Sequence, residues 1–145
     1  MRDTQKILRS VIYNALNGAV NVSGVIPVYD EKRPATSTSS VYILLSTQQE
    51  QDNSTSDAFI TLSTIDIEVC QDTESEVSKD VIDDVGNEVL TVLFPTAFTY
   101  GITQPSNMQV MNLNRDRTIT RAFEISPTKS ILRKIITISA TMVQQ

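Results

Sequence analysis

The sequence contains no histidine and no tryptophan, and its only cysteine is Cys70. Without histidine, the chain lacks the commonest general base near neutral pH and the commonest transition-metal ligand. A single cysteine excludes an internal disulfide and a zinc site of the usual cysteine and histidine type, and it is typical of proteins in a reducing compartment. These absences predict no catalytic residue, no cofactor and no metal ion.

Glycine is scarce, and long apolar runs are missing. The four glycines lie far apart, and none stands between a strand and a helix as a phosphate-binding loop requires. No segment approaches the roughly 20 apolar residues of a membrane span, and the first ten residues lack the apolar centre of a signal peptide. We expect the 145 residues to form a single domain, 1–145, that does not contact a membrane.

Charge is plentiful but unevenly distributed. The segment from Glu50 to Glu88 contains 12 of the 17 acidic residues and a single base, Lys79, whereas residues 115–145 contain six basic and two acidic residues. The net charge of −5 and the lack of a basic run argue against sequence-specific nucleic-acid binding. A subunit with one negative and one positive part is suited to meeting a copy of itself head to tail.

The beginning of the chain predicts a helix followed by an edge strand. Asp3 or Thr4 is suited to capping a helix that ends at the Asn17-Gly18 pair. The short apolar segment Val25–Tyr29 contains proline, which a sheet tolerates mainly at its edge. Apolar residues recur along the helix with the 3.6-residue period, at Ile7, Leu8, Val11, Ile12, Ala15 and Leu16.

Two strands are predicted next. Val41–Leu45 is rich in β-forming residues, and the polar run Gln48–Asp57 after it is interpreted as either a long hairpin tip or a mobile loop. Phe59–Cys70 alternates apolar and acidic residues in its second half, which gives the strand one apolar and one acidic face. The first half has the opposite parity, which predicts a bulge near Ser63-Thr64.

A second helix is predicted from Glu74 to Leu93. The segment Thr73–Glu76 matches the capping box, in which a threonine or serine is followed three residues later by glutamate. Gly86 lies inside this helix at a cost of about 1 kcal/mol relative to alanine, which either weakens the helix or reflects a close contact with the sheet. Phe94-Pro95 ends the helix.

The remaining segments predict more strands. Strands are expected at Met108–Leu113, Thr118–Ile125 and Ile136–Met142, with a loop at Thr96–Ser106 and a turn at Ser126–Lys129. The order of helix, strands, helix, strands predicts an α+β domain. Its sheet is mostly antiparallel, with two main helices packed on one face.

Among the residues of the sequence, pairs of carboxylates are the best candidates for a reaction site. Asp66 and Glu68 share one face of a predicted strand, and Asp83 and Asp84 are adjacent on the second helix. Such pairs can perform acid–base chemistry or hold a hard cation. We favour solvated surface charge, because exposed Asp and Glu are the norm. Cys70 has no base near it in the sequence, which favours a small strand residue over a nucleophile.

Three arginines, Arg115, Arg117 and Arg121, form a cluster in the basic part of the chain. They are able to bind phosphate. More often such a cluster faces solvent or an acidic partner, and here the acidic segment of another copy supplies that partner. The candidate oligomer interface therefore joins the three arginines to Asp66 and Glu68.

Taken in order, the predicted elements resemble the tail-terminator (tail-completion) proteins and related head–tail connector proteins of tailed bacteriophages. The resemblance is a pattern of elements over roughly residues 1–93 and 129–143, and the segment Asn114–Ser126 is longer than the family pattern. The elements that carry it are the helix Asp3–Leu16, the strands Val25–Tyr29 and Val41–Leu45, the acidic strand Ile65–Val69 leading into the helix Glu74–Leu93, and the closing strand Ile131–Met142.

The resemblance implies a virion protein without enzymatic activity, assembled in the host bacterial cytoplasm. Members of this family form rings of six or twelve copies that cap a tail tube or join it to the capsid neck. The implied partners are therefore copies of this chain, tail-tube and neck or connector proteins, and DNA that passes without specific binding. An acidic surface facing the channel would repel DNA phosphates. The candidate lumen-facing residues are Asp80, Asp83, Asp84 and Glu88.

Two other classes of function are kept as alternatives. A cytosolic acidic α+β adaptor would bind a basic protein through the segment Glu50–Glu88. A carboxylate-based hydrolase is the least favoured class, because the chain offers so few acid–base groups.

Overall fold

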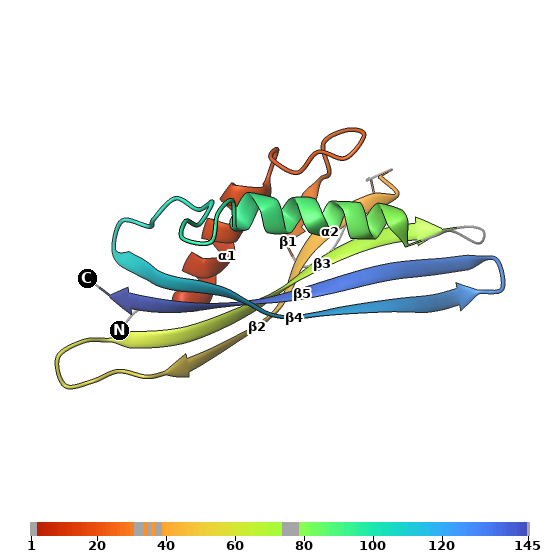
Figure 1. The fold of residues 1–145 in the computed structure, drawn as a ribbon. Helices are drawn as coiled ribbons and strands as arrows, with labels where there is room; N and C mark the ends of the chain where they lie inside the picture. The colour runs from red at the N-terminus through yellow and green to blue at the C-terminus, as the bar shows by residue number, and fades with distance from the viewer. Residues whose placement is uncertain (1–2, 31–33, 35, 37–38, 74–78, 145) are drawn as a thin grey trace.

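The computed structural model describes residues 3–30, 34, 36, 39–73 and 79–144. A five-stranded sheet has the order β1-β2-β3-β5-β4, and only the β1–β2 pair is parallel. Both helices lie on the same face of the sheet (Figure 1), which confirms the α+β prediction. The elements are α1 (Thr4–Leu16), β1 (Val28–Asp30), β2 (Val41–Asp52), β3 (Ile60–Thr73), α2 (Asp80–Leu93), β4 (Met108–Ser126) and β5 (Lys129–Gln144).

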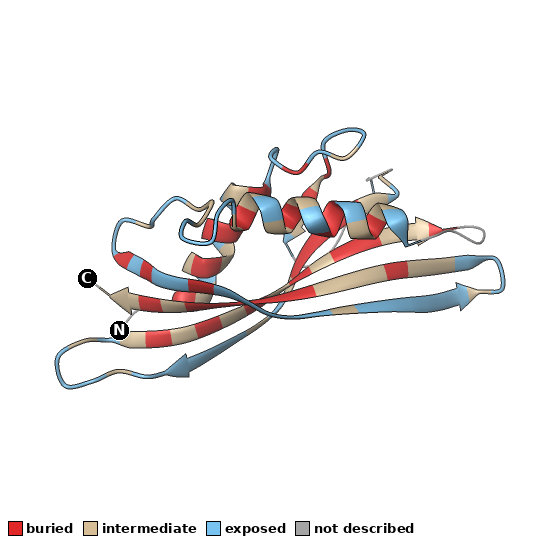
Figure 2. Ribbon diagram, in the orientation of Figure 1, coloured by how far each residue is buried: buried red, intermediate tan, exposed pale blue. Residues whose placement is uncertain are grey.

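The hydrophobic core lies between the helices and the sheet face beneath them (Figure 2). Apolar residues spaced by 3.6 in the helices and by two in the strands point to one side of each element, and these sides meet. Each buried Ile or Leu contributes about 1.5–3 kcal/mol relative to an exposed one. The opposite sheet face, over which the described residues place no helix, is called the open face below. The largest fully buried side chains are Leu8, Ile12, Leu16, Ile43, Leu45, Ile65, Ile67, Ile82, Leu93, Met108, Leu113 and Ile136.

The first helix forms as the sequence predicts, and an edge strand forms at Val28–Asp30, three residues later than the start of the predicted strand Val25–Tyr29. The Asp3 side chain accepts a hydrogen bond of 2.9 Å from the Gln5 amide and caps α1. The helix ends at Asn17, and Gly18 follows with a φ of +78°. At the sheet edge, the Pro27 carbonyl accepts a 2.9 Å hydrogen bond from the Ile43 amide. β1 then pairs with β2 over only three residues, Val28–Asp30.

β2 and β3 form a longer hairpin than predicted. β2 continues through the polar run as far as Asp52, so the hairpin interpretation is confirmed and the tip is confined to residues 53–59. The bulge predicted near Ser63-Thr64 is absent from the described pairings of β3, and the irregularity lies in β2, between Leu45 and Gln48. Ser63 is buried on the helix side, and its hydroxyl lies 2.5 Å from the Thr4 hydroxyl. A hydrogen-bond partner on α1 thus allows a polar residue at a core position.

The start of the second helix differs from the prediction. α2 begins at Asp80, and Thr73 belongs to β3, so Thr73 does not cap the helix. Residues 74–78, which contain the rest of the predicted capping box, lie outside the described residues. Thr73 is held in the sheet because it pairs with Ser130 of β5 and donates a 3.3 Å hydrogen bond to the Ser130 carbonyl. Long-range strand pairing outweighs the local capping signal here.

Gly86 marks a close approach of α2 to the sheet. A Cβ at this position would lie 2.9 Å from Cδ of Lys134 in β5. The absence of a side chain lets the Lys134 stem pass under the helix. The close-contact interpretation of this glycine is confirmed, and α2 ends at Phe94 as predicted.

β4 and β5 form a long hairpin joined by a turn at residues 126–129. β4 is continuous over 19 residues and includes both strands predicted between residues 108 and 125. Register shifts interrupt its pairing with β5, which accounts for the changing parity of its apolar residues. The outer half of β4, residues 114–126, is largely exposed, and its end extends beyond α2 (Figures 1 and 2).

Candidate functional site

The predicted interface residues Asp66 and Glu68 lie together on the open face, as strand alternation requires. The Thr137 hydroxyl on β5 donates a 2.7 Å hydrogen bond to Asp66 and accepts a 3.5 Å hydrogen bond from Nε of Arg117 on β4. Opposite charges from β3 and β4 are therefore linked across β5 within one subunit. Part of the charge complementarity predicted between copies is used inside the chain.

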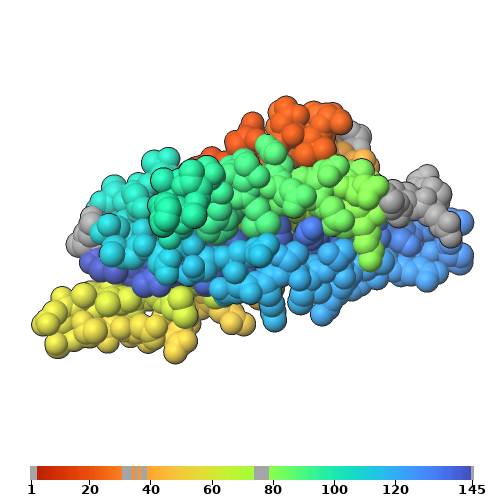
Figure 3. Space-filling view, viewed as in Figure 1, coloured from red at the N-terminus to blue at the C-terminus, as the bar shows by residue number. Residues whose placement is uncertain are grey.

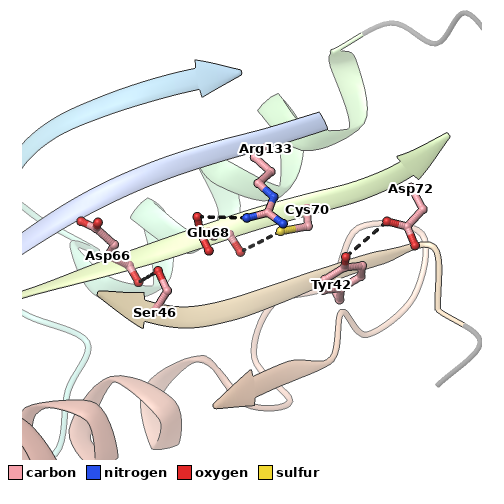
Figure 4. A network of polar contacts seen from close by, with 7 residues as sticks. All are labelled: Tyr42, Ser46, Asp66, Glu68, Cys70, Asp72 and Arg133. Atoms are coloured by element: carbon pink, nitrogen blue, oxygen red, sulfur yellow. Dashed lines mark hydrogen bonds and ion pairs between the residues drawn. The ribbon is translucent and has the colours of Figure 1, made fainter. Parts of the chain in front are cut away.

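Glu68 also has a basic partner within the subunit (Figure 4). Its carboxylate lies 3.6 Å from Nη1 of Arg133 on β5. The Arg133 guanidinium carbon lies 5.2 Å from the centre of the Phe123 ring on β4, at a distance where a cation–π contact contributes about 0.5–2 kcal/mol. Glu68 is only 13% exposed, so this carboxylate is closer to a structural ion pair than to solvated charge.

A register shift separates the three arginines of the predicted cluster. Arg115 pairs with Ile138 and Arg117 pairs with Thr137, so the intervening Asp116 is an extra residue in β4. Ile138 faces the core, which places Arg115 on the helix side of the sheet, where it lines a hollow with Phe94 and Tyr100. Arg117 remains on the open face. The pairing of Arg121 with Arg133 places Arg121 on that face too.

Cys70 is fully buried on the open-face side of β3, as expected for a small strand residue. It belongs to an apolar group with Tyr42 and Leu44, against which Tyr29 and Ile131 pack. Its thiol lies 3.9 Å from the Glu68 carbonyl (Figure 4). The cysteine thus contributes to packing on a face that carries both apolar and charged residues.

The four predicted lumen-facing acids have different environments on α2. Asp80 and Asp84 are exposed, and Glu88 is half-buried. Asp83 accepts a 2.9 Å hydrogen bond from Nζ of Lys134, which is 15% exposed between the helix and the sheet. Asp83 is therefore paired with a base of the same subunit, while Asp84 is exposed on the outer surface of α2.

A perturbed acid lies at the tip of the β2–β3 hairpin. The Ser54 hydroxyl and the Ser54 amide both donate to Asp52, and these hydrogen bonds hold the pKa of its carboxyl below the ordinary value of 3.8. The bonds close an Asx-type turn that begins the hairpin tip. Sequence reasoning missed this feature, although Asp-x-Ser at the start of a polar tip is a known turn signal.

The described residues contain no cluster of three or more Asp, Glu or Cys side chains that could hold a metal ion. Within the same residues, neither helix is long and apolar enough to cross a membrane. The charged groups described above instead contact one another or face outward.

No protein-family model and no curated protein sequence matches this chain. Among solved structures, it is similar to a chain of the "Virion of native gene transfer agent (GTA) particle". The TM-score is 0.68 and the sequence identity is 13%, and the likeness covers 94% of this chain and 94% of that chain. At this identity the likeness shows a shared fold over nearly the whole length of both chains.

Proposed function

We propose that this chain is a structural protein of a virion and has no enzymatic activity. It would assemble into a homo-oligomeric ring of six or twelve copies at the tail terminus or head–tail neck of a tailed phage, where it joins the tail tube to the capsid connector. The observation that carries the proposal is the end-to-end fold likeness to a chain of a virion particle. The order of elements, which resembles that of tail-terminator proteins, supports the same conclusion independently.

The charges of the subunit support self-assembly. The outer half of β4 presents Arg117 and Arg121 on an exposed strand, and the acidic segment contributes carboxylates from β2, β3 and α2. Asp66 and Glu68 have partners in their own subunit and Arg117 contacts Thr137, so contacts between copies would form at the exposed parts of these side chains and at Arg121. Unlike charges on separate surfaces allow a heterologous contact that closes into a ring.

The acidic surface of α2 is proposed to face the channel of the ring. Its exposed outer residues include Asp80 and Asp84, whereas the open face of the sheet mixes acids and arginines. A negative wall repels DNA phosphates and keeps passing DNA from binding. Electron cryomicroscopy of the assembled ring tests this orientation, and α2 on the outer circumference would refute it.

Sedimentation velocity of the purified chain, followed by electron microscopy of the main species, tests the ring itself. We expect a discrete species of six or twelve copies. The substitutions Arg117→Glu and Arg121→Glu together should shift it toward monomer, because they replace the exposed positive charges by negative ones. A chain that stays monomeric at high concentration and is absent from intact particles would refute the proposal. A monomer that captures a basic protein would favour the adaptor instead.

A further inference from the structure

The sheet has two free edges of unequal length. β4 forms one edge along all of its 19 residues. At the other edge, β1 covers β2 only at Ile43–Leu45, so within the described residues Ser46–Asp52 has no strand on its outer side. Backbone amides and carbonyls at such edges lack strand partners and are templates for a strand of another chain.

The β4 edge carries arginines and register shifts, which protect an edge strand from pairing, but one stretch of it has no such interruption. From Thr118 to Glu124 its pairing with β5 is regular, and this stretch contains neither proline nor glycine. Its side chains are mostly exposed, and they include Phe123 at 42%. In Figure 3 this strand (light blue) forms the front margin of the molecule below α2, and no other element covers it. An exposed and regular edge stretch of this kind is suited to strand addition.

The two edges carry opposite charges. Between Arg115 and Arg121, β4 has three arginines and one acid. The uncovered part of β2, Ser46–Asp52, has two acids and no base. Opposite charges on neighbouring strands stabilise a pair, and like charges destabilise it. Glu50 and Asp52 lie on the helix side of β2, as Arg115 does on β4, whereas Arg117 and Arg121 lie on the open face. The opposite net charges of the two edges therefore attract one copy to another, and two arginine-rich β4 edges repel each other.

Strand direction is also compatible with this pairing. β2 is antiparallel to β3, β3 to β5 and β5 to β4, so β2 and β4 run in opposite directions in one sheet. A second copy related by rotation about an axis along the strands keeps these directions, and its β2 runs antiparallel to the first copy's β4. The same operation repeats around a closed ring, whereas a two-fold contact between β4 edges stops at two copies.

We infer that the outer half of β4 pairs in the antiparallel direction with Ser46–Asp52 of β2 in a second copy, so that the sheet continues from subunit to subunit. The inference rests on the proposed ring, and it specifies that the β4 edge of one subunit and the β2 edge of the next form the contact. A continuous sheet satisfies the edge amides and carbonyls of both copies and buries the apolar outer side chains of β4.

Mixed disulfide cross-linking of single-substitution variants tests this pairing. Ile119 and Phe123 of β4 lie on the open face, and their partners are tested at Gln49 and Gln51, which lie on the open face of β2. Chains carrying Ile119→Cys or Phe123→Cys are mixed with mass-tagged chains carrying Gln49→Cys or Gln51→Cys and oxidised. Thr120→Cys is the matched control, because Thr120 is exposed too but lies on the helix side of β4.

The expected result is a mixed dimer band that contains one chain of each kind, for at least one of the open-face pairs. Cysteines on opposite faces of a sheet are too far apart to form a disulfide, so the Thr120→Cys mixture should give no such band. Cross-links between two chains that both carry the β4 cysteine would overturn the inference in favour of a two-fold contact. Intact rings without mixed cross-links would overturn the inference and leave the proposed function standing, whereas persistent monomers would overturn both.

Discussion

The ion pair between Asp83 and Lys134 links α2 to β5, and its removal has a predictable cost. Lys134 is only 15% exposed and its Nζ lies 2.9 Å from Asp83, which is 48% exposed. Asp83→Ala leaves the ammonium group largely buried without its carboxylate. Breaking a fully buried pair costs about 3–5 kcal/mol, but water reaches Asp83, so we expect a loss of about 1–2 kcal/mol.

Lys134→Met should behave differently, because it removes the charge and keeps an unbranched side chain beneath Gly86. Replacing a buried ion pair by apolar packing is often neutral, so we expect a change of no more than about 1 kcal/mol. Combining Asp83→Ala with Lys134→Met should then cost less than the sum of the two single changes. Asp84→Ala is the matched control, since Asp84 is an exposed acid on the same helix and should change stability by no more than about 0.5 kcal/mol.

The assay is equilibrium unfolding in urea, followed by circular dichroism at one protein concentration, because assembly makes apparent stability depend on concentration. For a chain of this size, each kcal/mol shifts the midpoint of thermal unfolding by about 2–4 °C, which gives an independent measurement. The reasoning is refuted if Asp83→Ala matches Asp84→Ala, or if Lys134→Met is as destabilising as Asp83→Ala.

Three further predictions concern single side chains. Gly86→Ala should stabilise the chain by about 1 kcal/mol when Lys134 is already alanine. In the natural sequence the new Cβ would lie 2.9 Å from Lys134 Cδ, so the gain should be clearly smaller or absent. Urea unfolding of the natural chain, the two single variants and the double variant measures this. Thr4→Val removes the hydrogen-bond partner of the buried Ser63 hydroxyl and should cost about 1–3 kcal/mol in the same assay. A neutral result would contradict the hydrogen-bond network. Ser54→Ala should raise the pKa of Asp52 toward 3.8, and NMR titration measures this change. Because the natural pKa is depressed, the Asp52 carboxylate stabilises the folded chain at a pH above its unfolded-state pKa. That stabilisation is lost as the pH falls through the folded-state pKa.

Elements with strong local signals were predictable from the sequence. α1 has a capping residue, a regular apolar period and a glycine after its end, and all three signals lie within residues 3–18. The turn between β4 and β5 is likewise a local signal. The alternation in β3 correctly placed Asp66 and Glu68 on one face. These successes need no knowledge of partners elsewhere in the chain.

Features that depend on distant partners were not predictable. The start of α2 was misplaced because Thr73 pairs with Ser130, which is 57 residues away. The polar end of β2 is a strand because Gln48 and Glu50 bond to α1 and the strand pairs with β3, none of which is visible in a local window. Arg115 was grouped with the other arginines because a register shift is defined only by the partner strand.

The strand order has a consequence for how the protein is made. β5 is the last strand in the chain, yet it lies between β3 and β4, and its contacts with β3 join residues as distant as Ile60 and Val143. While a ribosome is still translating the region before Lys129, β4 has no neighbour to hold it extended, and contacts so remote in sequence form late in folding. We therefore expect a nascent or truncated chain to lack an ordered β4 edge. Only a chain translated through β5 would then be able to pair with neighbouring copies.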